Sequence, residues 1–177
     1  MRAIRTRPLE LPADLEPLRR VDASSQSDSV LEVSATARGF RLTEVRVEQP
    51  VVKAHDFATE LTDPHKWWTE ASVACVGGQP VGFMSTVYHS WNRRQLLWGL
   101  YVDRHHRGRG IGGALVEVAL ERGRENLARQ LWLETQNTNL PAVRAYQAMG
   151  FDLVGLDRTL YAGAAAHDTA LYLARPL

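Results

Sequence analysis

Cysteine is almost absent from this sequence: Cys75 is the only one in 177 residues. An intrachain disulfide is therefore impossible, and a reducing compartment is expected. A lone thiol becomes a nucleophile only beside a base or a cation, and the surrounding segment SVACVGG supplies neither. We expect Cys75 to be a buried core residue.

Long apolar runs are also missing. No segment approaches the ~18 consecutive apolar residues that a membrane-spanning helix needs. The N-terminal stretch MRAIRTRPLE lacks the apolar core of a signal peptide. A cytoplasmic protein without a membrane partner is expected.

Neither sign of charge is in excess, because 21 basic and 20 acidic residues give a net charge of +1. A nucleic-acid partner would have to rest on the short cluster Arg104 to Arg109, and the near-neutral balance argues against it. The adjacent His105 and His106 have no third ligand at metal spacing, so no metal is expected. These histidines are expected to edge the phosphates of a ligand.

The remaining composition is that of an ordinary globular protein, with 45% hydrophobic and 23% charged residues. A chain of this length buries a sufficient core, and no repeat or linker divides it. The sequence therefore predicts a single domain over residues 1–177.

Apolar periodicity predicts the secondary structure. Strands are expected at 3–7, 71–76, 81–89, 96–102, 131–134, 152–156 and 169–174, a hairpin at 30–47, and helices at 14–21, 111–127 and 140–149. Residues 24–29 are expected to form a polar loop, and residues 49–70 give no clear pattern. Trp67 and Trp68, in that stretch, are expected to pack under a loop rather than cap a cleft. The unit from 96 to 134 should be a right-handed parallel crossover.

The stretch QLLWGLYVDRHHRGRGIGGAL, residues 95–115, organises the chain. An apolar strand, expected to be buried on both faces, runs into a turn crowded with glycines and arginines, and a helix follows directly. Glycines let backbone N–H groups approach an anion, and a helix N-terminus adds about half a positive charge. This stretch therefore predicts a site for a phosphorylated cofactor.

Three phosphate motifs compete for this stretch. A P-loop is disfavoured because no Lys follows the glycines. The dinucleotide fingerprint GxGxxG is matched by Gly108, Gly110 and Gly113, but five polar residues separate the strand from the first glycine. Arg107, Gly110 and Gly112 fit the third pattern, R-x-x-G-x-G/A, which resembles the acetyl-coenzyme A signature of the GNAT superfamily of N-acetyltransferases.

A second element agrees with this resemblance. The segment LWLETQNTNLPAVRAYQAMGF looks like the family's next strand and helix, with Asn139 five residues after Glu134 and Tyr146 seven after Asn139. The resemblance implies an α/β GNAT fold, with a mixed, mostly antiparallel β-sheet flanked by α-helices. It also implies acetyl-CoA as cosubstrate and direct transfer of acetyl to an amine.

The resemblance also implies roles for individual residues. The coenzyme's pantetheine arm would lie along Leu100 to Val102, its pyrophosphate on the amides from Arg107 to Gly113, and Tyr146 would be the general acid. The positions so assigned to the coenzyme are Leu100, Tyr101, Val102, Arg107, Gly108, Arg109, Gly110, Ile111, Gly112, Gly113, Asn139 and Tyr146. The alternative for Tyr146 is a core tyrosine with a backbone partner.

A general base is harder to identify. An alkylamine has a pKa of about 10.4, so freeing it at neutral pH costs roughly 4 to 5 kcal/mol and requires a carboxylate or a water chain. No carboxylate lies between Gln95 and Val102. Glu134 is the nearest candidate, and a simple ion pair with an Arg is the alternative.

A wider stretch is similar to streptothricin acetyltransferases. The similarity is carried by FRLTEVRVEQPVVK, SWNRR, LWLETQNTN, GLDRTLY and ALYLARPL. That subfamily has adjacent acids in the strand before the glycine turn, where Trp98 and Gly99 stand here. Trp98 is a candidate substrate contact, and Asp157 could bind a cationic amine or pair with an Arg.

The predicted function is acetylation of a small amine, with a streptothricin-like or aminoglycoside-like antibiotic as the first candidate. A peptide N-terminus or a polyamine is the rival acceptor. A protein that binds acyl-CoA without turnover is the alternative from a different class. An exposed edge strand in such a fold would allow a homodimer.

Overall fold

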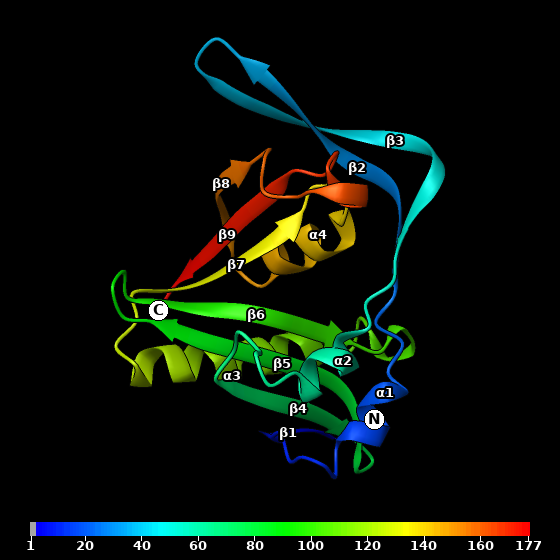
Figure 1. The fold of residues 1–177 in the computed structure, drawn as a ribbon, viewed down its shortest axis with the longest axis vertical. Helices are drawn as coiled ribbons and strands as arrows, with labels where there is room; N and C mark the ends of the chain where they lie inside the picture. The colour runs from blue at the N-terminus through cyan, green and yellow to red at the C-terminus, as the bar shows by residue number, and fades with distance from the viewer. Residues whose placement is uncertain (1–2) are drawn as a thin grey trace. The chain divides into compact units, whose positions relative to one another are not determined.

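The computed structural model describes residues 3–177, apart from the side chain of residue 164. The chain divides into two compact units (Figure 1). Unit 1 comprises residues 3–24, 54–132 and 176–177, and unit 2 comprises residues 25–53 and 133–175.

Unit 1 is built on a sheet in the order β1-β4-β5-β6-β7. Its strands are β1 (Ile4–Pro8), β4 (Glu70–Val76), β5 (Gln79–His89), β6 (Arg94–Val102) and the first residues of β7 (Gln130–Gln136). The first four strands pair antiparallel, whereas Arg94–Leu96 of β6 pair parallel with Gln130–Trp132. The predicted mixed, mostly antiparallel sheet and the parallel crossover are thus confirmed.

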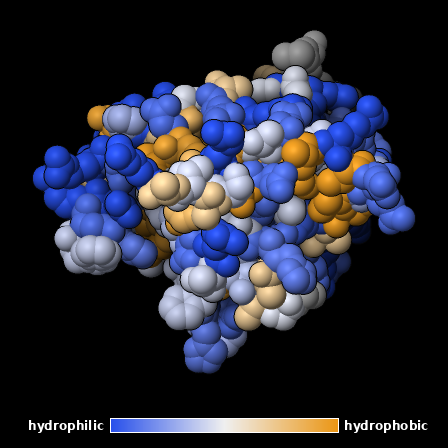
Figure 2. All heavy atoms as spheres, turned by 90° about the horizontal axis from the view of Figure 1, so that it is seen from above, coloured by the Kyte–Doolittle hydropathy of each residue, from blue (hydrophilic) through white to orange (hydrophobic). Residues whose placement is uncertain are grey.

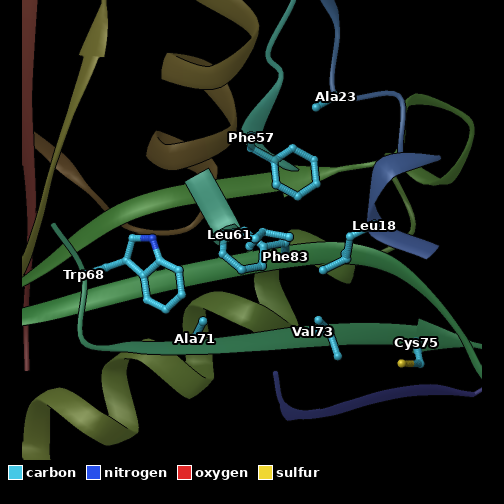
Figure 3. Close-up of a cluster of buried hydrophobic side chains, with 9 residues drawn as sticks. All are labelled: Leu18, Ala23, Phe57, Leu61, Trp68, Ala71, Val73, Cys75 and Phe83. Carbon is cyan, nitrogen blue, oxygen red and sulfur yellow. The ribbon is translucent and has the colours of Figure 1, made fainter. Parts of the chain in front are cut away.

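Helices cover both faces of this sheet. The helix α3 (Ile111–Glu125) packs on one face, and the short helices α1 (Leu15–Arg19) and α2 (Phe57–Thr62) lie on the other (Figure 3). A Cβ atom on Gly82 of β5 would lie 3.1 Å from the Ile111 side chain, so this glycine lets α3 approach the strands closely. Within residues 3–177, no helix is long and apolar enough to cross a membrane.

One hydrophobic core cluster of unit 1 lies between the sheet and the helices α1 and α2. Figure 3 shows Leu18 of α1 and Phe57 and Leu61 of α2 above the strands, close to Phe83. The cluster comprises Leu18, Ala23, Phe57, Leu61, Trp68, Ala71, Val73, Cys75 and Phe83. Cys75 is only 7% exposed, which confirms its predicted place in the core.

Asp14 joins β1 to α1. It directly precedes α1, but its carboxylate makes no capping hydrogen bond. It instead accepts two hydrogen bonds from the Arg7 guanidinium, at 2.6 and 2.7 Å, and one from the Glu10 amide. Asp14 is 2% exposed, and the Arg7 hydrogen bonds lower the pKa of its carboxyl.

The substitution Asp14→Asn should lower the free energy of unfolding by about 2 to 3 kcal/mol, because charge-assisted hydrogen bonds at a buried site are lost. The folded-state pKa of Asp14 lies below its ordinary value of 3.8. Its contribution is therefore complete above about pH 5 and is lost as the pH falls below about 4. Urea unfolding of both proteins at pH 7 and pH 3.5 measures this. An equal difference at both pH values would contradict the assignment.

Unit 2 combines a long hairpin with a second group of strands. The hairpin is formed by β2 (Ser25–Thr36) and β3 (Gly39–Lys53). The remainder of β7, β9 (Ala170–Pro176) and β8 (Asp152–Asp157) form the other group, in that order. The helix α4 (Leu140–Ala148) follows β7, and the short 3-10 turn η2 (Gly163–Ala165) precedes β9.

Several polar contacts fasten the hairpin to the rest of unit 2. The buried Asn137 side chain donates to the Leu31 carbonyl at 2.7 Å and accepts from the Thr169 amide at 2.6 Å. Lys53, at the end of β3, forms a 2.6 Å ion pair with Asp168. The middle of β2 and the end of β3 are therefore held to the turns beside β7 and β9.

The expected polar loop at 24–29 is wrong. Ser25–Ser27 pair with Val51–Lys53 and begin β2, because the extension of β3 supplies backbone partners for this polar stretch. Residues 49–70, which show no clear pattern in the sequence, contain the end of β3 and the helix α2. Of its two tryptophans, Trp68 packs in the core as expected, whereas Trp67 is 74% exposed.

Most of the surface visible in Figure 2 is hydrophilic, with its hydrophobic side chains in separate patches.

Candidate active site

A β-bulge interrupts β6 at Trp98. Ser85 of β5 pairs with Gly99 and Thr86 pairs with Leu97, which leaves Trp98 without a partner on β5. Bulges re-aim side chains, and here Trp98 is 43% exposed on the face that carries α2. The prediction that this strand is buried on both faces therefore holds for its first half and is wrong at Trp98.

Gly99 lies in a confined position next to this bulge. A Cβ atom there would lie 3.0 Å from the Tyr101 ring and 3.1 Å from Ser85 Oγ. The ring of Tyr101 stacks on Phe57 of α2 at 4.6 Å, which fixes its place. A side chain at position 99 is therefore excluded unless Tyr101 moves.

The end of β6 is held by Asp103. Its carboxylate accepts hydrogen bonds from the amides of Asp22 and His105, at 3.1 and 3.0 Å, and lies 3.0 Å from His106 Nδ1. Desolvation acts to raise the pKa of Asp103, but these hydrogen bonds together lower it. In the part of the chain that the structure describes, no group of three His, Cys, Asp or Glu side chains could hold a metal ion.

The Arg107 side chain is also engaged in hydrogen bonds within the protein. Its guanidinium donates to the carbonyl of Val102, at the end of β6, and to that of Ala23, both at 3.0 Å. The side chain thus ties the strand end to the segment before β2. The Arg107 backbone amide remains the group that the predicted phosphate contact would use.

The glycine turn, residues 107–113, presents backbone to open space. Gly108 and Gly110 adopt φ of +71° and +84°, and no protein atom lies within 4 Å of the Cβ position of either. Gly110 precedes α3 without a side-chain cap, so the first amides of a 15-residue helix are available to an anion. Arg109 is exposed and makes no hydrogen bond or ion pair with any residue among 3–177. This arrangement fits a phosphate group.

A carboxylate that the sequence did not point to lies beside β6. Glu60 of α2 accepts a hydrogen bond from the Trp98 indole, and its charge acts on Tyr101. Desolvation raises the pKa of Glu60, although the Trp98 hydrogen bond opposes that rise. The exposed Trp67 ring lies 6.3 Å from the Trp98 ring, with an angle of 28° between the ring planes. Unit 1 therefore has an acid between aromatic side chains next to the strand predicted to hold pantetheine.

In unit 2, Glu134 of β7 is bound by Tyr161, whose hydroxyl donates to its carboxylate. The Glu134 side chain is exposed, but desolvation by the surrounding chain raises the pKa of its carboxyl. The hydrogen bond from Tyr161 opposes this rise. Burial and the Glu134 charge raise the pKa of Tyr161 as well. Tyr161 lies in the GLDRTLY segment, and nothing in its spacing indicated this partner.

The other predicted residues of unit 2 lie around α4 and β8. Asn139 precedes α4, and its side chain lies 3.5 Å from the Ser25 hydroxyl. Tyr146 is half-buried, and its ring meets Phe151 edge-on at 5.6 Å. Asp157 accepts hydrogen bonds from the amide and hydroxyl of Thr159, both at 2.7 Å, which lower its pKa and form a local turn.

The predicted residues thus fall into two sets. Trp98, Leu100–Val102 and the glycine turn lie together in unit 1. Glu134, Asn139, Tyr146 and Asp157 lie in unit 2. Glu60 and Tyr161 were missed because their importance depends on tertiary neighbours.

Comparison with known proteins gives a consistent result. The model of the Acetyltransferase (GNAT) family matches residues 34–151. Streptothricin acetyltransferase of Streptomyces lavendulae is 37% identical over 172 residues, which cover 93% of this chain and 91% of that protein.

Solved structures agree in fold. The crystal structure of nourseothricin acetyltransferase aligns with a TM-score of 0.85 and 40% identity, covering 98% of both chains. A Bacillus anthracis protein solved in complex with acetyl coenzyme A aligns with a TM-score of 0.83 over 99% of this chain and 100% of that one, and its 24% identity supports the fold alone. The glycine turn before α3, the mixed sheet and the family match lead to one conclusion: this chain belongs to the GNAT family of acetyltransferases.

Proposed function

We propose that this protein transfers the acetyl group of acetyl-CoA to a primary amine of a small cationic molecule, with a streptothricin-like antibiotic as the first candidate. The observation that carries the proposal is the open glycine turn at the uncapped start of α3. The similarity to streptothricin acetyltransferase over most of both chains supports the choice of acceptor.

The glycine turn would hold the coenzyme's pyrophosphate through its backbone amides. Arg109 is exposed and would supply a mobile positive charge to the phosphates. The backbone of Leu100 to Val102 would align the pantetheine arm, and one N–H there would stabilise charge on the thioester oxygen. Acetyl-CoA would supply an activated acetyl group at the end of this arm.

The reaction joins the amine nitrogen to the acetyl carbonyl carbon as the carbon–sulfur bond breaks. The amine must lose a proton before it attacks, and the departing thiolate must gain one. Tyr146 is our candidate for the acid. Glu134, which is engaged by Tyr161 and has a raised pKa, is one candidate for the group that takes the amine proton.

We also propose that the two units act as one acetyltransferase domain. The strand β7 contributes residues to both, and the family match includes parts of each.

The single cysteine favours a cytoplasmic location, because it offers no disulfide for an oxidising compartment to form.

Release of free thiol from acetyl-CoA tests this function. Streptothricin, aminoglycosides, polyamines and short peptides are offered separately to the full chain. We expect rapid release with streptothricin and slower release with the other amines. Release with peptides or polyamines alone would replace the acceptor. If no amine gave release while acetyl-CoA raised the melting temperature, the protein would be a coenzyme-binding protein instead.

A further inference from the structure

The strand β6 offers no carboxylate that could take a proton from the acceptor amine. A primary amine is protonated at neutral pH and must give up a proton before it can attack. The strand carries no carboxylate from Gln95 to Val102, and a Cβ atom on Gly99 would lie only 3.0 Å from the Tyr101 ring. The carboxylate must therefore come from another element.

Glu60 of α2 supplies a carboxylate next to Trp98 of β6. Phe57 and Leu61 are buried in the core of unit 1 and fix α2 over the sheet (Figure 3). Glu60 lies between them in the same helix, accepts a hydrogen bond from Trp98 of β6 and is near enough for its charge to act on Tyr101. The fixed helix therefore holds its carboxylate against the strand predicted to carry pantetheine.

The Trp98 indole beside this carboxylate lies next to a second indole, that of Trp67. Trp98 and Trp67 lie 6.3 Å apart, and both are exposed. The faces of indole rings attract ammonium groups. An acid beside a pair of exposed indoles is therefore suited to a cationic amine.

A buried hydroxyl on the same face adds a further polar group. Ser85 Oγ is completely buried and has no hydrogen-bond partner among the described residues. It lies 3.1 Å from the position that a Gly99 Cβ would occupy. Buried polar groups in proteins are nearly always satisfied, so this hydroxyl is available to an amine N–H or a bridging water.

We propose that Glu60, with Trp98, Trp67 and Ser85, forms the binding site of the acceptor amine, and that the Glu60 carboxylate takes the proton of the ammonium. The inference rests on the proposed acetyl transfer. One proton passes from the ammonium to Glu60 and then to solvent, and the freed nitrogen forms a bond to the acetyl carbon. The carbon–sulfur bond breaks, and the second proton lost by nitrogen balances the one that the thiolate gains.

Burial sets the pKa of Glu60, and several titratable groups lie on the elements around it. From β6, Tyr101 faces it, and burial keeps that phenol protonated by raising its pKa. From α1, Glu16 and Arg19 are exposed and paired with each other at 2.6 Å. Of the groups flanking α2, His55 meets the Tyr101 ring, and Lys66 lies over the Trp68 ring. The raised pKa of Glu60 brings it nearer to neutrality, where a general base is most effective.

The test is the isosteric substitution Glu60→Gln, whose side-chain oxygen can still accept from the Trp98 indole. We expect kcat/KM for streptothricin at pH 7 to fall by ~100-fold, as for loss of a general base, with the KM for acetyl-CoA unchanged. The activity of the variant should then rise with pH towards the pKa of the amine itself, about 10.4, because deprotonation by solvent replaces Glu60.

Asp56→Asn is the matched control. Asp56 precedes α2, is exposed, and binds the Thr59 hydroxyl, which asparagine can also do. The substitution removes the same charge at the start of the same helix. It should change kcat/KM by no more than roughly twofold, the size of ordinary surface effects. Equal losses in both variants would overturn the proposal, because a general electrostatic effect would then explain them.

Failure of the inference is distinguishable from failure of the proposed function. If the wild type releases thiol and Glu60→Gln matches it at every pH, the Glu60 assignment is overturned and acetyl transfer stands. If the wild type releases no thiol, acetyl transfer is overturned. Calorimetry of streptothricin binding then decides the amine site: weaker binding to Glu60→Gln supports it, and equal binding overturns it.

Discussion

Replacement of Tyr146 by phenylalanine is expected to lower kcat by ~10- to 1,000-fold, because the departing thiolate loses its proton donor. The edge-on packing of this ring against Phe151, at 5.6 Å, involves the ring and would be kept. The KM for acetyl-CoA should change far less than kcat. Free-thiol release at saturating acetyl-CoA and amine measures the effect.

Tyr88→Phe is the matched control for Tyr146. It makes the same chemical change in β5, at a half-buried tyrosine outside the candidate site. Its kcat should stay at the wild-type value. An unchanged kcat in Tyr146→Phe would show that Tyr146 is a packing residue, and the acid would have to be sought elsewhere in unit 2.

Gly110→Ala should raise the KM for acetyl-CoA by ~10-fold or more, equivalent to about 1.4 kcal/mol of lost binding. The Cβ atom would project into the open space before α3, where we place the pyrophosphate. It would also strain the left-handed backbone, since Gly110 has φ of +84°. Both effects act on the amides that would receive the phosphates.

Gly78→Ala separates these two effects. Gly78, in the turn between β4 and β5, has φ of +83° and also has no protein atom within 4 Å of its Cβ position. The cost of left-handed strain, roughly 1 to 2 kcal/mol, is therefore the same at both positions. Similar losses of melting temperature with a raised KM in Gly110→Ala alone would confirm the phosphate site. A raised KM in both variants would refute it.

The sequence predicted the strand, glycine turn and helix from 95 to 125 because their signals are local. Apolar runs, four clustered glycines and a 3.6-residue period need no knowledge of distant residues. The same holds for the hairpins at Gly39 and at Gly77, where glycines mark the turns. Family membership followed from these local patterns.

Side-chain partners were beyond the sequence because they depend on tertiary packing. The Arg107 side chain, for example, donates to the carbonyl of Ala23, which is 84 residues away in the chain. Glu60 lies in a 6-residue helix that is too short to show periodicity. Its approach to β6 depends on the burial of Phe57 and Leu61. The bulge at Trp98 is likewise set by pairing with β5.

The tie made by Arg107 has a consequence for binding kinetics. Because its guanidinium already joins the carbonyls of Val102 and Ala23, the strand end is ordered before any coenzyme arrives. The entropy of ordering this segment is then lost during folding instead of at the encounter with coenzyme. Association with the coenzyme would accordingly need no loop closure at the end of β6, and its rate would be limited by diffusion and orientation.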